Sequence, residues 1–506
     1  MTQPEGALPG SGPAQSDASL LPMVARNSAF VFGSQVLIRI VAFAFNVYVV
    51  RRLGAVQFGR YATVMAYVAL FGIFTDLGLA PYSVREMAED RSRTAWLLPN
   101  SIAIRTLLSL AIAVIAPLSA LWLGKEDDLV TGILIASAGQ LVWAVQGPLG
   151  CALIARERLD YDAAFSFVER VVFWVLGTLV LVSGGSFIGL IVASLVAVGV
   201  RAICSGWVLL RRLGVGRLDV SVRHWPGMVR AALSFGVSSI AFTLRNQFDT
   251  LLMSFVLTDQ AVGWYNVPYN LIGMLLLLAF SVGQAMYPSM ARAYVVDPAA
   301  MATLIRRAVK YLLVIALPIT VGGTILARPV VILLYTQEFE PSVRILQVML
   351  WALPALFLLE LLGRLANALH LERELARVTV INAVITIVLD LLLVPTLGAA
   401  GAALALLGGR VVNLVQNWRL VNRGLRFGIR WGEIGRTVLA AVLMGGLVFL
   451  LRDAFLVLPI GVGALAYVAL LFGLGVLTWS ELVQLGRMVF VRRVPPRAVE
   501  AGGKCE

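Results

Sequence analysis

Almost the whole chain consists of apolar stretches that are each long enough to cross a lipid bilayer. A transmembrane helix needs about 20 predominantly apolar residues, and fourteen segments meet this requirement. Hydrophobic residues make up 59% of the 506 residues and charged residues 14%, which leaves no room for a folded soluble domain. We therefore expect an all-α polytopic membrane protein. The expected spans are residues 28–50, 61–84, 99–123, 129–155, 163–183, 187–210, 230–256, 262–290, 308–332, 344–368, 376–395, 399–418, 434–451 and 457–485.

The loops between these segments alternate in their content of basic residues. Loops after even-numbered segments are rich in arginine, whereas those on the opposite side carry only Arg51, Arg52, Arg60, Lys125, Arg328, Arg344 and Arg452. Because basic residues are retained in the cytoplasm, both termini should be cytoplasmic, which requires an even number of spans. This bias also accounts for the net charge of +13, so we expect no nucleic-acid partner.

The order of spans and loops predicts how the chain is organised. The first 22 residues lack the basic region and short apolar core of a cleaved signal peptide. Three cysteines and two histidines, none at ligand spacing, indicate no disulfide framework, metal site or cofactor. The predicted parts are a disordered cytoplasmic tail (1–26), an N-terminal six-helix lobe (27–212), a cytoplasmic linker (213–229), a C-terminal six-helix lobe (230–423), two further transmembrane helices (424–489) and a basic cytoplasmic tail (490–506).

An internal repeat relates the two predicted lobes. The hairpin at 53–61 reads LGAVQFGRY and the hairpin at 257–265 reads LTDQAVGWY, so that leucine, glycine and tyrosine coincide at an offset of 204. A weaker match relates 152–159 to 368–375 at an offset of 216. Six spans separate the halves, so both have the same orientation and should be related by a pseudo-twofold axis along the membrane normal. This arrangement predicts a cavity between the lobes and is typical of a transporter.

Ionisable side chains inside the predicted spans are candidates for function, because a charge at the bilayer centre costs about 2.5–3.5 kcal/mol even on insertion-derived scales. Arginines outnumber acids in the spans, and guanidinium groups bind phosphate in a bidentate manner. Arg39 lies in the middle of the first span, with no acidic residue three or four positions away. We therefore predict that the central cavity binds an anionic substrate through Arg39, Arg245 and Arg364.

Acidic residues in the spans leave an alternative open, in which the charges pair structurally or bind a coupling ion. Asp76 could pair with Arg39 across the first hairpin. Asp249 and Glu360 each lie one helical turn from one of the other two candidate arginines, a spacing that permits ion pairs. The acidic candidates for charge pairing or ion coupling are therefore Asp76, Asp249 and Glu360.

Other intramembrane charges suggest structural roles. Arg105 lies near a cytoplasmic boundary and is expected to snorkel towards water. Asp390 and Arg410, on consecutive spans, could neutralise one another.

Several stretches resemble the polysaccharide flippases that export O-antigen and related repeat units. They are VRRLGAVQFGRY (50–61), DLGL (76–79), REMA (85–88), DTLLM (249–253), GWY (263–265) and LGAAGAAL (397–404). The similarity extends over essentially the whole chain, in order, and includes the fourteen spans. That family belongs to the multidrug/oligosaccharidyl-lipid/polysaccharide (MOP) exporter superfamily.

This resemblance implies that the chain is a transporter and not an enzyme. The implied substrate is an oligosaccharide linked to undecaprenyl diphosphate, moved from the inner to the outer leaflet of the bacterial cytoplasmic (inner) membrane. The diphosphate would then be the group that the arginines bind. A polysaccharide polymerase and glycosyltransferases are the implied partners, and we expect a monomer.

The related lipid II flippases of peptidoglycan synthesis are the first alternative. They typically carry an arginine in span one, followed six and seven residues later by an Arg-Asp pair. Arg39 is similar to the first position, but Phe45 and Asn46 replace the pair, which favours a polysaccharide unit.

Two further alternatives are a polytopic glycan polymerase or glycosyltransferase and a multidrug extruder. The longest predicted outward loop, 327–342, offers Glu338 and Glu340 but little else for catalysis. Multidrug extruders normally have twelve spans and bind cations. No nucleotide-binding motif is present, so we expect coupling to the membrane potential, with H⁺ or Na⁺ binding at Asp249 or Asp76.

Overall fold

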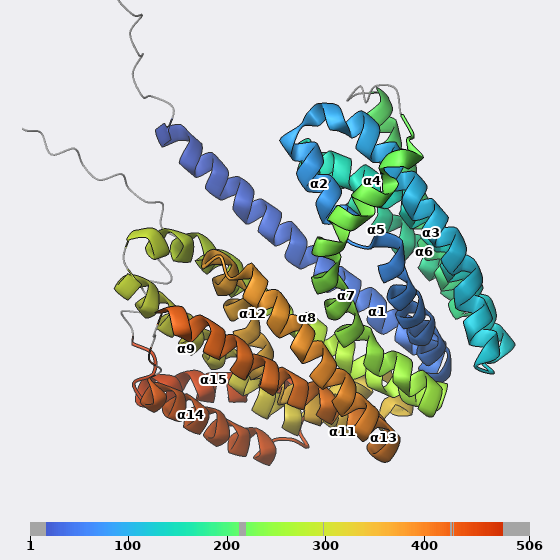
Figure 1. Cartoon of the computed structure of the whole chain (residues 1–506). Helices are drawn as coiled ribbons and strands as arrows, with labels where there is room; N and C mark the ends of the chain where they lie inside the picture. Colours follow the sequence, from blue (N-terminus) through green and yellow to red (C-terminus); the bar gives the residue numbers. More distant parts are fainter. Residues whose placement is uncertain (1–16, 212–218, 297, 426–427, 429, 479–506) are drawn as a thin grey trace, which may run out of the picture.

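The computed structural model describes residues 17–211, 219–296, 298–425, 428 and 430–478, and these residues form helices without any strand (Figure 1). Side chains are described from Leu37 onward within these ranges, except at 234–235, 238, 285–289, 291–300 and 424–425. The all-α fold class is therefore confirmed. The first half contains α1 (Asp17–Asp76), α2 (Leu79–Glu89), α3 (Thr94–Trp122), α4 (Asp127–Ala155), α5 (Leu159–Val182) and α6 (Phe187–Arg211). The remainder contains α7 (Trp225–Val256), α8 (Asp259–Val296), α9 (Pro298–Ile325), α10 (Ala327–Tyr335), α11 (Ser342–Leu350), α12 (Leu353–Ala368), α13 (Glu372–Leu425), α14 (Trp431–Leu450) and α15 (Val457–Gly473).

Two glycines divide long helices into pairs of arms. Gly54 has φ 71° and ψ 178° inside α1, and Gly398 has φ 63° and ψ −142° inside α13. Positive φ angles are accessible to glycine without the steric cost that a side chain adds. The expected spans 28–50 and 61–84 accordingly lie on the two arms of α1, the second continued by α2, and the spans 376–395 and 399–418 lie on the two arms of α13.

Length and composition alone identify eight helices among the described residues that could cross a membrane, or up to ten if each bent helix pair is one span. The bends are 42° between α1 and α2 and 47° between α11 and α12, where Pro354 lies at the start of α12. Each of the fourteen expected segments overlaps helices of the described residues. Segment 308–332 covers parts of both α9 and α10, and segment 457–485 extends beyond α15, with residues after 478 outside the described part. The count of fourteen crossings therefore stays a prediction.

The helices of the structure extend into two segments that the sequence analysis assigned to the N-terminal tail and the linker. Residues 17–26, expected in the N-terminal tail, form the first turns of α1, since the apolar run 20–24 extends the helical pattern. In the expected linker, residues 219–229 include a 3-10 turn at Val222–His224 and the start of α7. Residues 1–16, 212–218 and 479–506 lie outside the described residues.

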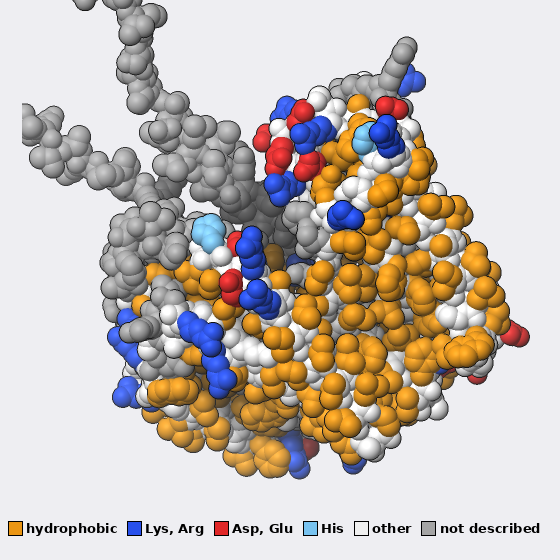
Figure 2. Space-filling view, in the orientation of Figure 1, with side chains coloured by type: hydrophobic (Ala, Val, Ile, Leu, Met, Phe, Trp, Pro, Cys, Tyr) orange, Lys and Arg blue, Asp and Glu red, His pale blue; other side chains and the backbone are white. Residues whose placement is uncertain are grey.

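The helices form two groups, and the first arm of α1 runs between them (Figure 1). One group contains α2–α6 with the second arm of α1; the other contains α9 and α12–α15. Apolar side chains cover the outer face of the first group, while charged side chains gather at its ends (Figure 2). On α3, for example, four apolar side chains are at least half exposed: Leu107, Leu110, Val114 and Leu118. Such a continuous apolar surface is typical of a protein embedded in lipid.

The two hairpins of the internal repeat contact each other. A β-carbon at Gly59 would overlap the backbone carbonyl oxygen of Asp259, and one at Gly263 would overlap that of Ala55. Gly263 lies 204 residues after Gly59, and Asp259 lies 204 residues after Ala55, so the repeat makes the two contacts equivalent. A reciprocal contact of this kind is the signature of a twofold axis. The structure thus supports the pseudo-symmetric arrangement that the repeat predicts, and it places the axis at this contact.

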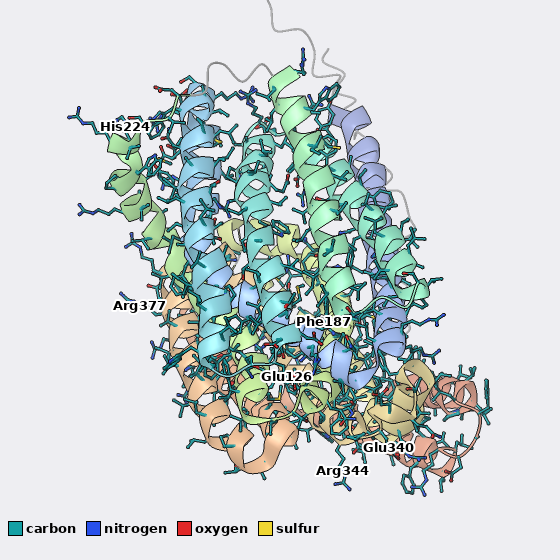
Figure 3. All side chains as sticks on the ribbon, turned by 90° about the vertical axis from the view of Figure 1, so that its right-hand side faces the viewer. Glu126, Phe187, His224, Glu340, Arg344 and Arg377 are labelled. Carbon is teal, nitrogen blue, oxygen red and sulfur yellow. The ribbon has the colours of Figure 1, made fainter. Side chains whose placement is uncertain are left out.

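Figure 3 shows Glu126, Glu340 and Arg344 at one end of the bundle and His224 at the other. Glu126, Glu340 and Arg344 belong to the predicted outer side, and His224 belongs to the predicted cytoplasmic linker.

We expect reporter fusions after Gly124 and Gly184 to report the outside, and fusions after Arg91 and Arg158 to report the cytoplasm. Paired alkaline phosphatase and fluorescent-protein fusions measure this, and a reproducible inversion at any one of these hairpins would contradict the orientation.

Candidate functional site in the centre of the helix bundle

Two of the three predicted arginines meet at one aromatic ring. The guanidinium carbon of Arg39 on α1 lies 5.1 Å from the ring centroid of Phe280 on α8, and that of Arg364 on α12 lies 4.7 Å from the same centroid. A guanidinium group within about 6 Å of an aromatic centroid is attracted by the negative face of the ring. The three side chains, which come from three different helices, therefore form a cluster that we call the Phe280 cluster.

Arg364 is held by two neighbours. Its Nε and Nη2 donate to Glu360 Oε1 at 3.0 and 2.7 Å, which confirms the predicted one-turn ion pair, and its Nη1 donates to Gln284 Oε1 at 3.0 Å. A β-carbon at Gly283 would lie 2.7 Å from Arg364 Nε, so this glycine of α8 makes room for the guanidinium group. The side chain of Arg364 is consequently fixed before any ligand binds.

Arg39 differs from Arg364 in having no acidic partner. Its side chain is exposed, and among the described residues no carboxylate lies within ion-pair distance of it. Its contact with Phe280 leaves the N–H groups of the guanidinium fork available to a ligand. A charge in mid-membrane without a structural partner is the type of group that binds an anionic substrate.

The alternative pairing of Arg39 with Asp76 is not formed. Asp76 Oδ1 instead accepts from Arg105 Nη2 at 2.9 Å and from the backbone N–H of Ala80 at 3.1 Å. The helix breaks directly after Asp76, where Leu77 has φ 46°, so the carboxylate turns towards α3. The expectation that Arg105 snorkels to water is wrong too, because only 12% of its side chain is exposed.

The third predicted arginine, Arg245 on α7, lies in a separate cluster. Its guanidinium carbon is 5.4 Å from the ring centroid of Phe242, and no ion pair with Asp249 is formed. Asp249 is buried and accepts hydrogen bonds from the hydroxyl of Tyr265 on α8 and from the backbone N–H of Thr250 at 2.6 Å. The same one-turn spacing that forms an ion pair in α12 therefore does not form one in α7, because α8 supplies a competing donor.

Two charges of α13 complete this second cluster. Arg410 Nη2 donates to Asn246 Oδ1 at 3.2 Å, and Arg410 is close enough to Arg245, Asp249 and Asp390 to interact electrostatically with each. Asp390 is 1% exposed, and neither of its carboxylate oxygens has a hydrogen-bond partner among the described residues. The neutralisation of Asp390 by Arg410 is thus electrostatic only, without a hydrogen-bonded pair. An unsatisfied buried carboxylate is expensive unless it binds a proton or a cation.

On the arginine-poor side, polar contacts connect the two halves. Arg60 of α1 donates to Asp259 of α8 at 2.9 Å and also pairs with Asp128 at 3.3 Å and with Glu126. Lys125 donates to the backbone carbonyl of Ser254, and its burial lowers the pKa of its ammonium group, although nearby Asp259 acts in the opposite direction. Together with the reciprocal glycine contact, these bonds form what we call the outer closure.

Sequence reasoning missed Phe280 and most of the outer closure. No spacing rule connects Phe280 to Arg39 or Arg364, because the three residues meet only when the helices pack. The glycine and tyrosine positions of the repeat did carry a signal for the closure, since both glycines lie at the contact. Glu338, predicted as a candidate for a rival catalytic function, accepts from the backbone N–H of Ala55 at 2.8 Å and belongs to the same closure.

A bundle of apolar helices in two related halves, with charged clusters between helices in its interior, defines a multi-pass membrane protein with the organisation of a transporter. The chain belongs to the polysaccharide biosynthesis protein family, whose model matches residues 24–294. The MatE family model matches residues 235–392. These matches confirm the resemblance to polysaccharide flippases of the MOP superfamily.

Known proteins are similar over most of the chain. A curated protein from Haloferax volcanii, the probable low-salt glycan biosynthesis flippase Agl15, is 22% identical over 448 residues, which cover 86% of this chain and 90% of that protein. The structure of the lipid II flippase MurJ in an inward closed conformation has a TM-score of 0.68 at 14% identity and covers 90% of this chain and 100% of its own. An inward-facing multidrug resistance MATE transporter has a TM-score of 0.62 at 13% identity and covers 77% of this chain and 98% of its own. At these identities the structural likenesses show the fold.

Proposed function

We propose that this protein is a flippase that moves a polyprenyl-diphosphate-linked oligosaccharide from the inner to the outer leaflet of the cytoplasmic membrane. Membership of the polysaccharide biosynthesis family and the name of the Haloferax relative support the class of substrate. The observation that carries the proposal is the Phe280 cluster, in which Arg39 has no acidic partner while Arg364 is fixed beside it.

The chemistry of the cluster suits a diphosphate. A guanidinium fork donates two parallel hydrogen bonds to phosphate oxygens, and charge-assisted bonds of this type are about twice as strong as neutral ones. Arg364 is partly neutralised by Glu360, so Arg39 supplies most of the uncompensated positive charge. Because Arg39 is on α1 and Arg364 is on α12, a diphosphate between them would contact both halves of the protein and could link their movement.

A closed outer side is what the inward-facing state, in which the substrate would enter, requires. The halves contact each other on the arginine-poor side, which is the predicted outside, through Arg60 and the two repeat glycines. In an alternating-access cycle this closure would have to open to release the glycan. Outward movement of a diphosphate with a charge near −2 is favoured by the inside-negative potential, by about 2.3 kcal/mol per charge per 100 mV.

Return to the inward-facing state would require a second source of free energy, such as the binding of a cation to a buried carboxylate. The buried carboxylates of Asp249 and Asp390 are the candidates, because Asp390 has no hydrogen-bond partner among the described residues and the two interact electrostatically. Binding of H⁺ or Na⁺ would remove the cost of this buried charge. Asp76, the other candidate from the sequence, is already paired with Arg105 and is less suited to this role.

The structure gives less support to the rival functions. Phe45, at a position where lipid II flippases typically carry a charged pair, packs edge-to-face on Phe173 of α5 with ring centroids 5.3 Å apart. In the outward loop, Glu340 pairs with Arg328 at 2.9 Å and Glu338 caps the backbone at Ala55. Both acids that a polymerase or glycosyltransferase would need are therefore engaged in structural contacts.

Reconstitution tests the proposed function directly. In liposomes containing only this protein and a fluorescent polyprenyl-diphosphate oligosaccharide, we expect the glycan to become accessible to an added lectin or oxidant on the opposite leaflet without ATP. An inside-negative potential should accelerate the movement. Protein-free liposomes serve as the control. A strict requirement for ATP, or no movement above the protein-free rate, would refute the proposal.

A further inference from the structure

A cavity lies outside the Phe280 cluster, between α9, the C-terminal arm of α13 and the N-terminus of α14. Arg306 and Lys310 from α9 line it, together with Trp418 from α13, Glu433 from α14 and Arg430, which precedes α14. The basic residues belong to loops and helix ends on the arginine-rich side of the predicted topology. The cavity is therefore expected at the cytoplasmic boundary of the membrane.

The lining side chains carry a positive surplus. Of the lining residues that the structure describes, three are cationic, and Glu433 supplies the one carboxylate, which pairs with Arg430 at 2.9 Å. Arg306 donates to the neutral hydroxyl of Thr303 at 2.9 Å, which uses one of its five N–H donors. Such a surplus within a cavity attracts an anion with several acceptor oxygens, such as a phosphate group.

The local backbone adds to this preference. Helix α14 begins at Trp431, and its N-cap residue Arg430 makes no side-chain cap hydrogen bond. The positive end of the helix dipole lies beside the cavity, because Arg430 and Glu433 line it. The cavity and its cations carry the argument, and the helix end adds a smaller contribution of the same sign.

The remaining walls are apolar. Val309, Leu313 and Ile434 line the cavity beside the cations, and Trp418 is an aromatic residue of the kind that is enriched at membrane interfaces. A soluble anion needs no apolar wall, whereas a phospholipid presents a phosphate joined to the start of its acyl chains. Basic cavities between transmembrane helices on the cytoplasmic side commonly bind anionic lipid headgroups.

We propose that this cavity is a binding site for the phosphate headgroup of an anionic glycerophospholipid. The bound lipid would connect α9 and α13 to the N-terminal end of α14. Deeper in the membrane, α14 packs tightly on α9, where a β-carbon at Gly445 would lie 2.5 Å from Val321. The site is separate from the proposed transport path, so it does not depend on the identity of the glycan.

Lipid titration of the purified full-length protein in detergent tests the site, with binding read by native mass spectrometry and thermal stability. We expect dioleoyl-phosphatidylglycerol to bind and stabilise the protein, and dioleoyl-phosphatidylcholine, with the same acyl chains, to do so much more weakly. The double substitution Arg306→Gln/Lys310→Gln should weaken phosphatidylglycerol binding about tenfold or more, the effect of losing a charge-assisted hydrogen bond.

Two matched variants complete the experiment. Arg373→Gln/Arg377→Gln removes two exposed charges on the same predicted side, and Arg306→Lys/Lys310→Arg keeps the charge of the cavity; both should bind phosphatidylglycerol as the unchanged protein does. Equal binding of the two lipids, or unchanged binding by the Gln double variant, would overturn the proposal. Saturation of the stabilising effect by inorganic phosphate alone would overturn the assignment to a lipid.

Discussion

Replacing Arg39 by alanine is expected to lower glycan export about 10- to 100-fold while the amount of protein in the membrane stays unchanged. The loss corresponds to one charge-assisted interaction with the diphosphate, worth about 1.5–3 kcal/mol. Abundance should be preserved because Arg39 forms no ion pair with a described residue, and its contact with Phe280 is only one cation–π interaction. Arg39→Lys should restore export in part, since an ammonium group keeps the charge but not the bidentate fork.

Arg105→Ala is the comparison variant, because it removes an intramembrane arginine that has a structural partner. Arg105 pairs with Asp76 and is largely buried, so its removal leaves an uncompensated carboxylate and should destabilise the protein by about 3–5 kcal/mol. Membrane abundance should then fall, and Arg105→Ala/Asp76→Ala should recover part of it. Immunoblotting of membranes and surface glycan staining measure the two quantities separately. Normal export by a well-expressed Arg39→Ala protein would rule out substrate binding by this residue.

Alanine at Gly59 is expected to open the outer closure. A methyl group there would overlap the carbonyl oxygen of Asp259, and backbone atoms on both sides of the contact cannot move aside as a flexible side chain can. Overpacking of this kind costs about 1–3 kcal/mol, which shifts the ratio of closed to open forms about 5- to 150-fold. Gly263→Ala should act in the same direction, because the pseudo-twofold axis makes its contact with Ala55 equivalent.

Spin-label distances across the outer side measure this shift. Labels at Gly184, in the turn between α5 and α6, and at Arg344, in α11, should give a short distance in the unchanged protein and a longer one in both glycine variants, with the native cysteines replaced. Gly273→Ala is the control: it lies on the same helix as Gly263, and a β-carbon there would have no atom within 4 Å. A well-folded Gly59→Ala protein with the unchanged distance distribution would show that the glycine contact does not hold the closure.

The apolar segments determined the helices, and the internal repeat determined which hairpins are equivalent. Both signals are distributed along the chain, so neither requires knowledge of how the helices pack. The repeat even identified the glycines that meet at the axis, because close backbone approach tolerates no side chain. The number of separate helices did not follow from the sequence, since bends such as the one between α11 and α12 split a single apolar segment into two short helices.

The partners of the intramembrane charges show what only the tertiary structure decided. Glu360 and Arg364 pair within one helix, as their spacing predicts, because no other helix of the described part supplies a competing donor to the carboxylate. Asp249 has the same spacing from Arg245 but bonds to Tyr265 of α8 instead. No sequence spacing predicts that Arg39 and Arg364 both contact Phe280. Local patterns determine which charges enter the membrane, whereas helix packing determines which groups surround them, because a buried charge interacts with whatever the neighbouring helices bring within a few ångströms.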